Sequence, residues 1–518
     1  MDDVEGRTDD QSSDRMEGAS PIPEWRAPEG TDRPAPRRAR RVPVAVGTVV
    51  ALLAGAMAFV VVRQDGGEAA GAKPVKSAEP PKHPSAWDPR LTDLVDFVEK
   101  DRDLRFEHPV YVDFLTPEEY KTSAAAEAQK LTDKERREIE QTVSLLRSFG
   151  LLEGDVDLLD RMIQLTEEGT LAYYDPMTER VTVRGTELTL GVKGTLVHEL
   201  THALQDQHFD LKPMVAEDQT MKEAEAASHL RNLVEGDAVR VENHWVESLG
   251  KTDQKTYAEQ GQAVGNEADL EGIPEVIIAA MGTPYSFGHG LVEAIAATGG
   301  NTSVDMAFRS PPTSDEQIFD AFRYLAKDQP QTVAAPALKE GEQTIPDSEP
   351  QSFGAFMLFV TLAQRLDPVP AMRAVDGWGG DQMVIFNRDG RQCARVHLAA
   401  DSVADRNEMQ AALQKWVAGM PAGVASLSRA GELIELNSCD PGAKYKPAGR
   451  SIQEALNVPL TRVTMAVTVM AMWDADAEQA RCYTGKVIQE FTVEELSAPT
   501  ATPADTKRIE ELAASCIS

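Results

Sequence analysis

Two histidines and a glutamate in residues 198–208, HELTHALQDQH, form the pattern HExxH. On a helix, His198 and His202 are one turn apart on the same face, so both imidazole rings can reach one metal ion. Glu199 then stands beside the open position of that metal, where a carboxylate can act as a general base. The pattern therefore predicts a hydrolytic site with Zn²⁺ as its metal and Glu199 as its base.

The residues around this pattern favour a helix with one packed face. On a helical wheel of about 100° per residue, Leu196, Leu200 and Leu204 lie close together and the two histidines lie roughly opposite. One face would then pack while the other faces a cleft. A helix with two incidental histidines is the alternative, and the amphipathic pattern favours the metal site.

A catalytic zinc ion needs a third protein ligand, and Glu235 in the motif LVEGDA is the best candidate. It lies on a helix predicted from about 223 to 245. Asp237 shares the apolar face of that helix, where a carboxylate must be paired, so we expect it to orient a ligating histidine. A solvated helix charge is the alternative interpretation of Glu235, and His229 and His244 are expected to be structural.

His208 is a second candidate for the third ligand. It follows His198 at the spacing with which metzincin peptidases place their third histidine. That class has glycine where this chain has Gln205, because the chain must leave the helix in a left-handed conformation. His208 is therefore the weaker candidate.

The motifs HELTHALQDQHFDL, LVEGDA, SPPTSDEQ and GWGGDQ resemble those of gluzincin metallopeptidases and of a group of bacterial, often membrane-anchored, zinc metallopeptidases. In gluzincins, a glutamate followed by Gly-x-Ala on a later helix completes a His, His, Glu site. The resemblance implies a zincin-like fold, with His198, His202 and Glu235 as zinc ligands and Glu199 as the general base. The interval from His202 to Glu235 is longer than in many gluzincins, which implies an insertion.

These residues predict a mechanism. Zinc lowers the pKa of its bound water toward about 7, and Glu199 takes the proton and later protonates the leaving amine. Tyr285 or His289, in residues 283–290 (TPYSFGHG), could stabilise the oxyanion, although a turn built around the glycines explains that stretch equally well. We expect a peptidase that acts on proteins or peptides; the alternative is a binding or scaffolding ectodomain that keeps the fold without turnover.

Residues 42–62 form an uncharged apolar run, long enough to cross a membrane as a helix. Four arginines stand at 37–41 and acidic residues follow Arg63, so the positive-inside rule predicts a cytoplasmic N-terminus and an extracytoplasmic remainder. A cleaved signal peptide, with a site at 70–72, is the alternative. In both cases the bulk of the chain is exported.

All four cysteines fall in the exported C-terminal third, where an oxidising compartment favours disulfides. Because each pair closes a local loop, we expect Cys393 to pair with Cys439 and Cys482 with Cys516. A four-thiolate zinc site is the alternative, but CxxC spacing is missing. The net charge of −32 argues against a nucleic-acid partner.

The expected fold class is α+β: a zincin-like metallopeptidase domain, mainly helical with a small sheet, followed by a smaller, disulfide-bearing α+β domain. The chain is predicted to divide into a disordered cytoplasmic tail, a membrane helix, a linker, the metallopeptidase domain, a polar linker and an accessory domain, with the bounds 1–41, 42–62, 63–89, 90–326, 327–351 and 352–518.

Several local elements are expected. Residues 170–174 and 180–184 flank a turn and predict a β-hairpin just before the HExxH helix. In zincins a strand at this place borders the cleft, and its edge could bind an extended peptide, whereas a plain structural hairpin is the alternative. The accessory domain is predicted to contain a helix, two strands, a second helix and a hairpin, near 353–366, 383–386, 393–398, 405–417 and 427–436.

Overall fold

The computed structural model describes most of the chain after residue 82. The described residues are 83–120, 122, 133–169, 171–216, 219–267, 270–346, 348–447, 449–492, 495 and 502–517. The predicted tail and membrane helix, 1–41 and 42–62, lie outside the described residues, as does the first linker up to residue 82. Helices combine with two sheets in the described part, which confirms the predicted α+β class.

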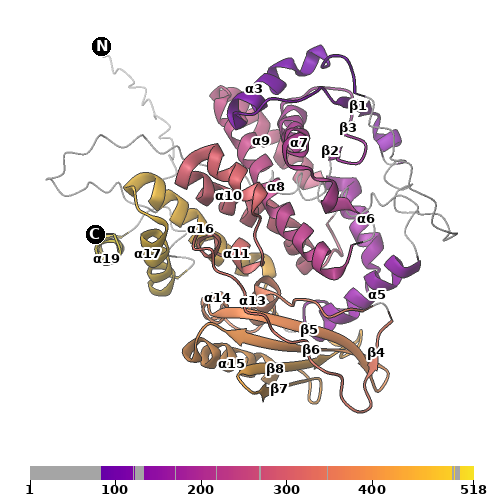
Figure 1. Ribbon diagram of the computed structural model, residues 1–518, viewed down its shortest axis with the longest axis vertical. Coiled ribbons are helices and arrows are strands. Elements are labelled where there is room, and N and C mark those ends of the chain that lie inside the picture. Colours follow the sequence, from indigo (N-terminus) through magenta and orange to yellow (C-terminus); the bar gives the residue numbers. More distant parts are fainter. Residues whose placement is uncertain are drawn as a thin grey trace, which may run out of the picture.

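A three-stranded sheet lies near the N-terminal end of the described chain (Figure 1). Its strands are β1 (Tyr111–Leu115), β2 (Ala172–Asp175) and β3 (Arg180–Arg184), in the order β1-β3-β2. β2 and β3 are antiparallel, which confirms the predicted hairpin, and β1 runs parallel to β3. Alternate residues of β2 and β3 are buried in a hydrophobic cluster with α7 (Leu190–Phe209), as expected for strands with one face toward a core.

The two helices that carry the predicted metal ligands begin at well-defined caps. The Thr189 side chain accepts a hydrogen bond from the Val192 amide at the start of α7. α8 (Met221–Ser248) begins with a capping box in which Thr220 and Glu223 each accept from the other's backbone amide. α7 and α8 pack side by side, so their facing side chains meet in the interior.

α10 (Glu275–Arg309) also packs along α8, and glycines allow the close approach (Figure 1). A Cβ atom on Gly236 of α8 would lie 2.2 Å from the backbone of Gly288 in α10. A Cβ atom on Gly290 would lie 2.5 Å from a valine side chain of a later helix. The turn considered for residues 283–290 is therefore wrong, because this stretch is helical and its glycines serve helix contacts.

The C-terminal part contains a five-stranded antiparallel sheet in the order β4-β5-β6-β8-β7 (Figure 1). The strands are β4 (Gln343–Thr344), β5 (Trp378–Arg388), β6 (Arg391–Ala400), β7 (Ala425–Ala430) and β8 (Leu433–Cys439). Cys393 and Cys439 lie opposite each other in β6 and β8 and form a disulfide, which confirms the first predicted pair.

Helices from both parts of the chain cover this sheet. α5 (Asp133–Ser148), from the N-terminal part, packs against β6 and β8, and α15 (Val403–Ala418) packs against β6 and β7. α13 (Ala355–Ala363) and α14 (Pro368–Val375) pack on α15. The other described helices have the bounds η1 (Pro89–Leu91), α3 (Thr92–Arg102), α6 (Leu158–Gly169), η2 (Lys212–Val215), α9 (Lys251–Glu267), α11 (Glu316–Phe319), α12 (Ala321–Leu325), α17 (Ala477–Glu490) and α19 (Pro503–Ala514). A disulfide joins Cys482 to Cys516, which confirms the second predicted pair.

Among the described residues, one helix is long and apolar enough to cross a membrane, α16 (Ile452–Trp473). It packs against α10, α13, α14 and α17. Arg462 in its middle is buried and donates to Asp376 Oδ1 at 2.6 Å. A buried, paired charge and contacts with several helices are typical of a core helix in a folded domain. Because 42–62 is not described, the membrane anchor predicted there stays a prediction.

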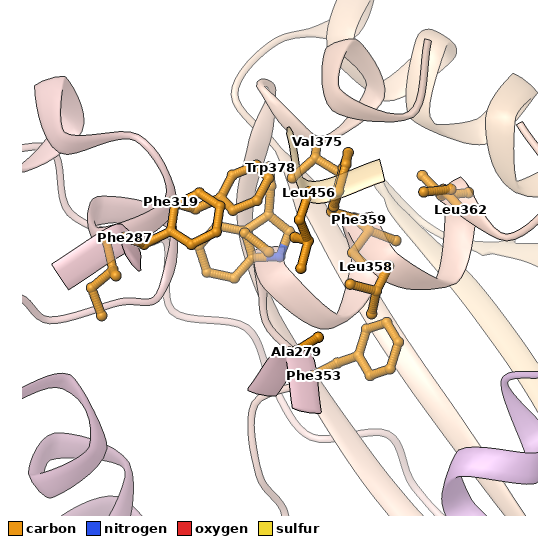
Figure 2. Close-up of a cluster of buried hydrophobic side chains, with 14 of the residues drawn as sticks. Ala279, Phe287, Phe319, Phe353, Leu358, Phe359, Leu362, Val375, Trp378 and Leu456 are labelled. Atoms are coloured by element: carbon orange, nitrogen blue, oxygen red, sulfur yellow. The ribbon is translucent and has the colours of Figure 1, made fainter. Parts of the chain in front are cut away.

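One buried hydrophobic cluster contains residues from both sides of 327–351. Figure 2 shows part of this cluster, where Phe287 and Phe319 lie near Trp378, Leu456 and Phe359. The predicted bounds of the two domains stay predictions. Because the two parts share a core, an unfolding experiment can test whether they behave as separate domains.

Candidate metal centre

His198 and His202 of α7 and Glu235 of α8 lie together in the interior and form the candidate metal group. Their residues are 2%, 2% and 1% exposed. Glu235 Oε2 is 3.2 Å from His198 Nε2 and 3.3 Å from His202 Nε2. Atoms that bind zinc at about 2.1 Å in a tetrahedral site are separated by about 3.4 Å. The three side chains therefore already have the spacing of metal ligands, and the group can bind a metal ion.

Glu242 faces His198 from the other side of the ring. Glu242 Oε2 lies 3.3 Å from His198 Nδ1, and the Tyr257 hydroxyl donates to Glu242 Oε1 at 2.6 Å. A carboxylate facing Nδ1 favours the tautomer that leaves Nε2 available as a ligand, and it makes the imidazole more basic. This place of Glu242 was not predicted from the sequence, although its spacing of seven residues from Glu235 puts both on one face of α8.

Gln205 orients His202. His202 Nδ1 is 2.9 Å from Gln205 Oε1, and Gln205 Nε2 donates to Asp237 Oδ2 at 2.9 Å. Arg102 of α3 donates to the same Asp237 oxygen at 2.8 Å, so the hydrogen-bond network extends from His202 to Arg102. Asp237 was expected to orient a histidine itself, but it acts through Gln205, because the amide side chain fills the space between them. The helical spacing of three residues between His202 and Gln205 is the signal that could have shown this.

Glu199 is buried next to the candidate metal group. Its side chain accepts a hydrogen bond at Oε2 from the Tyr174 amide of β2, at 2.7 Å. Burial raises the pKa of Glu199 to about 7, although the neighbouring histidines act in the opposite direction. A carboxylate with a pKa near neutrality can both accept and return a proton at ordinary pH.

Two further side chains, the buried Tyr285 and the partly buried Arg231, interact with Glu235. Burial and the charge of Glu235 raise the pKa of Tyr285 well above its ordinary value, so its hydroxyl stays protonated and can donate. Burial lowers the pKa of Arg231, and the charge of Glu235 opposes this shift. His289, the other candidate oxyanion donor, lies 3.3 Å from Asn243 and is not part of the candidate metal group.

The buried charges fit a divalent cation. Glu235 Oε1 is buried without a hydrogen-bond partner, although buried acceptors are usually paired. Burial would raise the pKa of Glu235, but the two histidines hold it below its ordinary range, so this side chain is a carboxylate. Glu199 and Glu242 are buried in the same region. A cation would offset these charges, and two imidazoles with one carboxylate are a known donor set of catalytic zinc.

The remaining candidate histidines lie elsewhere. His208 is near the end of α7, where its Nε2 is 2.8 Å from the carbonyl oxygen of Arg105, and it is not part of the group. His229 is buried, and burial lowers its pKa to about 4. His244 Nδ1 lies 3.0 Å from Asp101 Oδ2. The structure thus brings together the two imidazoles and the carboxylate of the predicted set, without His208.

A cavity of about 450 Å³ lies along α8 and α10. Its lining includes Ser228, His229 and Asn232 of α8, and residues 351–357 form another wall. Asn232 is one helical turn before Glu235, so the cavity lies close to the candidate metal group along the helix, although the group itself does not line it.

Two motifs of the sequence hold the segment 351–357, which contributes to one wall of this cavity. Asp315, from SPPTSDEQ, accepts from the amides of Ala355 and Phe356, at 2.9 Å each. Asp381, from GWGGDQ, accepts from the amides of Phe353 and Gly354, at 2.7 and 2.8 Å. Gly354 is needed between them because its φ is +81° and a Cβ atom would lie 2.3 Å from Asp315. These motifs therefore position the start of α13.

Comparison of the chain with protein-family models, with curated proteins and with solved structures finds no match. The residues of the candidate metal group and their surroundings are therefore the basis for a functional assignment.

Proposed function

We propose that this protein is a zinc-dependent metallopeptidase held at the outer face of a cell membrane. The observation that carries the proposal is the buried group of His198, His202 and Glu235 with Glu199 beside it. Two imidazoles, one carboxylate ligand and one carboxylate base are the set used by zinc hydrolases. The resemblance of HELTHALQDQH and LVEGDA to gluzincin motifs supports the peptide bond as the target.

The side chains have distinct roles in the proposed reaction. A zinc ion bound here would supply an activated water and polarise the substrate carbonyl. Glu199 accepts a proton from the attacking water and returns it to the leaving amine, while the Tyr174 amide holds its other oxygen. Tyr285 donates to the carbonyl oxygen as negative charge develops there. Gln205 and Glu242 keep the two imidazoles in the orientation that directs Nε2 to the metal position.

A peptide substrate is supported by the position of β2. This strand is at the edge of the small sheet, and its Tyr174 amide reaches Glu199. An extended peptide that adds to such an edge by main-chain hydrogen bonds would run past the proposed base. A zincin-like fold, with an edge strand beside the metal-binding helix, is part of this proposal.

The proposed location is supported by two features outside the site. The run 42–62 is apolar and follows a cluster of arginines, which favours a single membrane helix with a cytoplasmic N-terminus. The two disulfides favour an oxidising, extracytoplasmic compartment for the folded part.

The test is cleavage of casein by the full chain, with and without a chelator. We expect chelation to stop cleavage and added zinc to restore it. Glu199→Gln keeps the size of the side chain but removes the base, so it should reduce cleavage by about 100- to 10,000-fold with zinc still bound. Glu118→Gln, on the exposed surface, is the matched control and should leave both cleavage and zinc content unchanged.

A non-catalytic zincin-fold ectodomain, with a binding or scaffolding role in the cell envelope, is the second candidate. The burial of His198, Glu199, His202 and Glu235 favours it, because a substrate must reach these groups before they can act. Bound zinc without cleavage of casein or of a peptide library would support this role and contradict the peptidase proposal.

A further inference from the structure

A second group of potential metal ligands lies at the start of the described chain. His83, His108 and Glu179 each bring one ligand atom into a common space, and all three side chains are partly exposed or at the border of burial. His83 precedes the first helix, His108 precedes β1, and Glu179 belongs to the turn between β2 and β3. These residues lie outside the HExxH motif and were not singled out by any pattern.

The distances from the carboxylate to the two ring nitrogens in this group are close to those between metal ligands. Glu179 Oε2 lies 3.5 Å from His83 Nε2 and 3.6 Å from His108 Nε2. These separations are too long for charge-assisted hydrogen bonds, but they are close to the spacing of about 3.4 Å between atoms that share a tetrahedral zinc ion. The two rings are stacked with their centroids 3.5 Å apart. Two imidazoles that share a tetrahedral zinc ion have centroids about 5 Å apart, so the rings must turn apart when they bind the ion.

Glu179 has a buried carboxylate oxygen without a hydrogen-bond donor. The residue is only 9% exposed, and its Oε2 atom is buried without a hydrogen-bond partner. Its other oxygen accepts from Lys212 Nζ at 2.8 Å, which fixes the carboxylate. Asp206 and Asp210 also interact with Lys212, so the single ammonium group is surrounded by three carboxylates. Negative charge remains in excess around the unpartnered oxygen.

The orientation of His108 also favours a ligand. Its Nδ1 lies 3.3 Å from the carbonyl oxygen of Pro109 and 3.4 Å from Gln207 Nε2. In the tautomer that carries Nδ1–H, the carbonyl oxygen accepts and Nε2 can bind a metal. Gln207 of α7 holds the adjacent backbone by donating to the His108 carbonyl oxygen at 3.0 Å. The ring is therefore placed before any metal binds.

We propose that His83, His108 and Glu179 form a second zinc-binding site, separate from the candidate metal group. Two imidazoles and a carboxylate suit Zn²⁺. The bound ion would join the segment before the first helix to the β2–β3 turn. Because β2 carries the amide that holds Glu199, the second ion would stabilise the strand next to the proposed base without contacting it.

The test is the zinc content of the full chain, purified without a histidine tag and equilibrated with Zn²⁺. We expect about two equivalents in the wild type and about one in His202→Ala, since that change removes the buried centre only. Adding His83→Ala and His108→Ala to His202→Ala should remove the remaining equivalent. Co²⁺ in place of Zn²⁺ should give a visible absorption band in His202→Ala that the additional changes abolish.

Two controls separate loss of ligands from loss of structure. His208→Ala removes a nearby histidine that lies outside the site and should leave both equivalents bound. Lys212→Met removes the neighbouring positive charge and should retain or strengthen the second site. The proposal is overturned if His202→Ala binds no zinc, or if its remaining zinc survives the loss of both His83 and His108. Neither result depends on peptidase activity.

Discussion

Gln205 shows how much a single side chain can determine at this site. It contacts His202 Nδ1 with its oxygen and Asp237 with its nitrogen, so it links a proposed ligand to a buried carboxylate that is itself held by Arg102. A glycine at this position would end the helix in the manner of metzincins. The glutamine instead continues the helix and fixes the ring, which favours Glu235 over His208 as the third ligand.

Replacing this glutamine should weaken metal binding without removing a ligand. Gln205→Leu removes the hydrogen-bond partner of His202 Nδ1 and leaves Asp237 with one fewer donor, so we expect zinc affinity to fall by about 10- to 100-fold. Competition with a chelator measures the change, in a His83→Ala background so that only the buried centre binds. An unchanged affinity in a normally folded Gln205→Leu protein would show that Gln205 does not position the ring.

His229 gives a prediction about pH. Burial lowers its pKa from 6.5 to about 4, so the unfolded chain binds a proton on this ring at a higher pH than the folded chain does. As pH falls from 7 to 4, this difference lowers the free energy of unfolding by up to about 3 kcal/mol. His229→Gln should remove that loss, so the variant gains stability relative to the wild type on acidification. Urea unfolding at several pH values measures it.

His244 is the matched control with the opposite sign. Its hydrogen bond to Asp101 raises its pKa, so the folded state binds the proton more tightly than the unfolded state. Its contribution to stability is present at low pH and is lost as pH rises through the folded pKa. His244→Gln should therefore lose stability relative to the wild type on acidification. The same slope for both variants would contradict these assignments.

At the scale of elements, the contact between α8 and α10 places Tyr285 near Glu235. Gly236→Ala puts a methyl group within 2.2 Å of the backbone of Gly288, which cannot move as a side chain can. We expect a loss of about 1–3 kcal/mol in unfolding free energy from overpacking. Gly485→Ala is the control, since nothing lies within 4 Å of its Cβ position in α17, and it should be neutral or stabilising. Thermal unfolding of both variants measures the difference; equal effects would exclude a tight contact at Gly236.

The sequence predicts those elements whose signals are local. His198 and His202 meet because one helix turn separates them, and the hairpin before them follows from alternation around a turn. The helical stretch around Gly288 was not predicted, and neither was α16. α10 contains Pro284 and α16 contains Pro459. An internal proline argues against a helix when only the neighbouring residues in the sequence are considered. Only packing against neighbouring helices offsets that cost.

The surroundings of the ligands are harder to predict for a related reason. Glu235 could be selected as a ligand from the motif LVEGDA, but the partners of the ligands come from separate parts of the chain. Arg102 reaches the site from α3, and Tyr257 reaches Glu242 from α9. No spacing along the sequence encodes such contacts, because they depend on how whole helices are arranged. The same limit explains why His83, His108 and Glu179 formed no recognisable pattern.

At the scale of the whole molecule, the N-terminal helices and the C-terminal sheet are tied together. Arg147 of α5 donates to both oxygens of Asp440, at 3.0 and 2.6 Å, just after β8. The Phe149 ring lies 4.5 Å from that of Phe353 and 6.3 Å from that of Trp416, between centroids. The buried cluster thus contains residues from both sides of the segment 327–351, which was predicted to be a linker.

This continuity predicts that the two parts unfold together. Two domains with separate cores could unfold at different denaturant concentrations, whereas a shared core couples them into one transition. Hydrogen exchange followed by mass spectrometry can be measured separately for α8 and β6 at increasing denaturant concentrations. Both elements should lose protection at the same midpoint concentration of denaturant. Phe149→Ala removes a fully buried ring at the junction, so it should lower the free energy of unfolding by about 3–5 kcal/mol. Both midpoints should then fall together. Separate midpoints for α8 and β6 would instead support independent domains with the predicted bounds 90–326 and 352–518, because the buried contacts at the junction would then not couple the unfolding of the two parts.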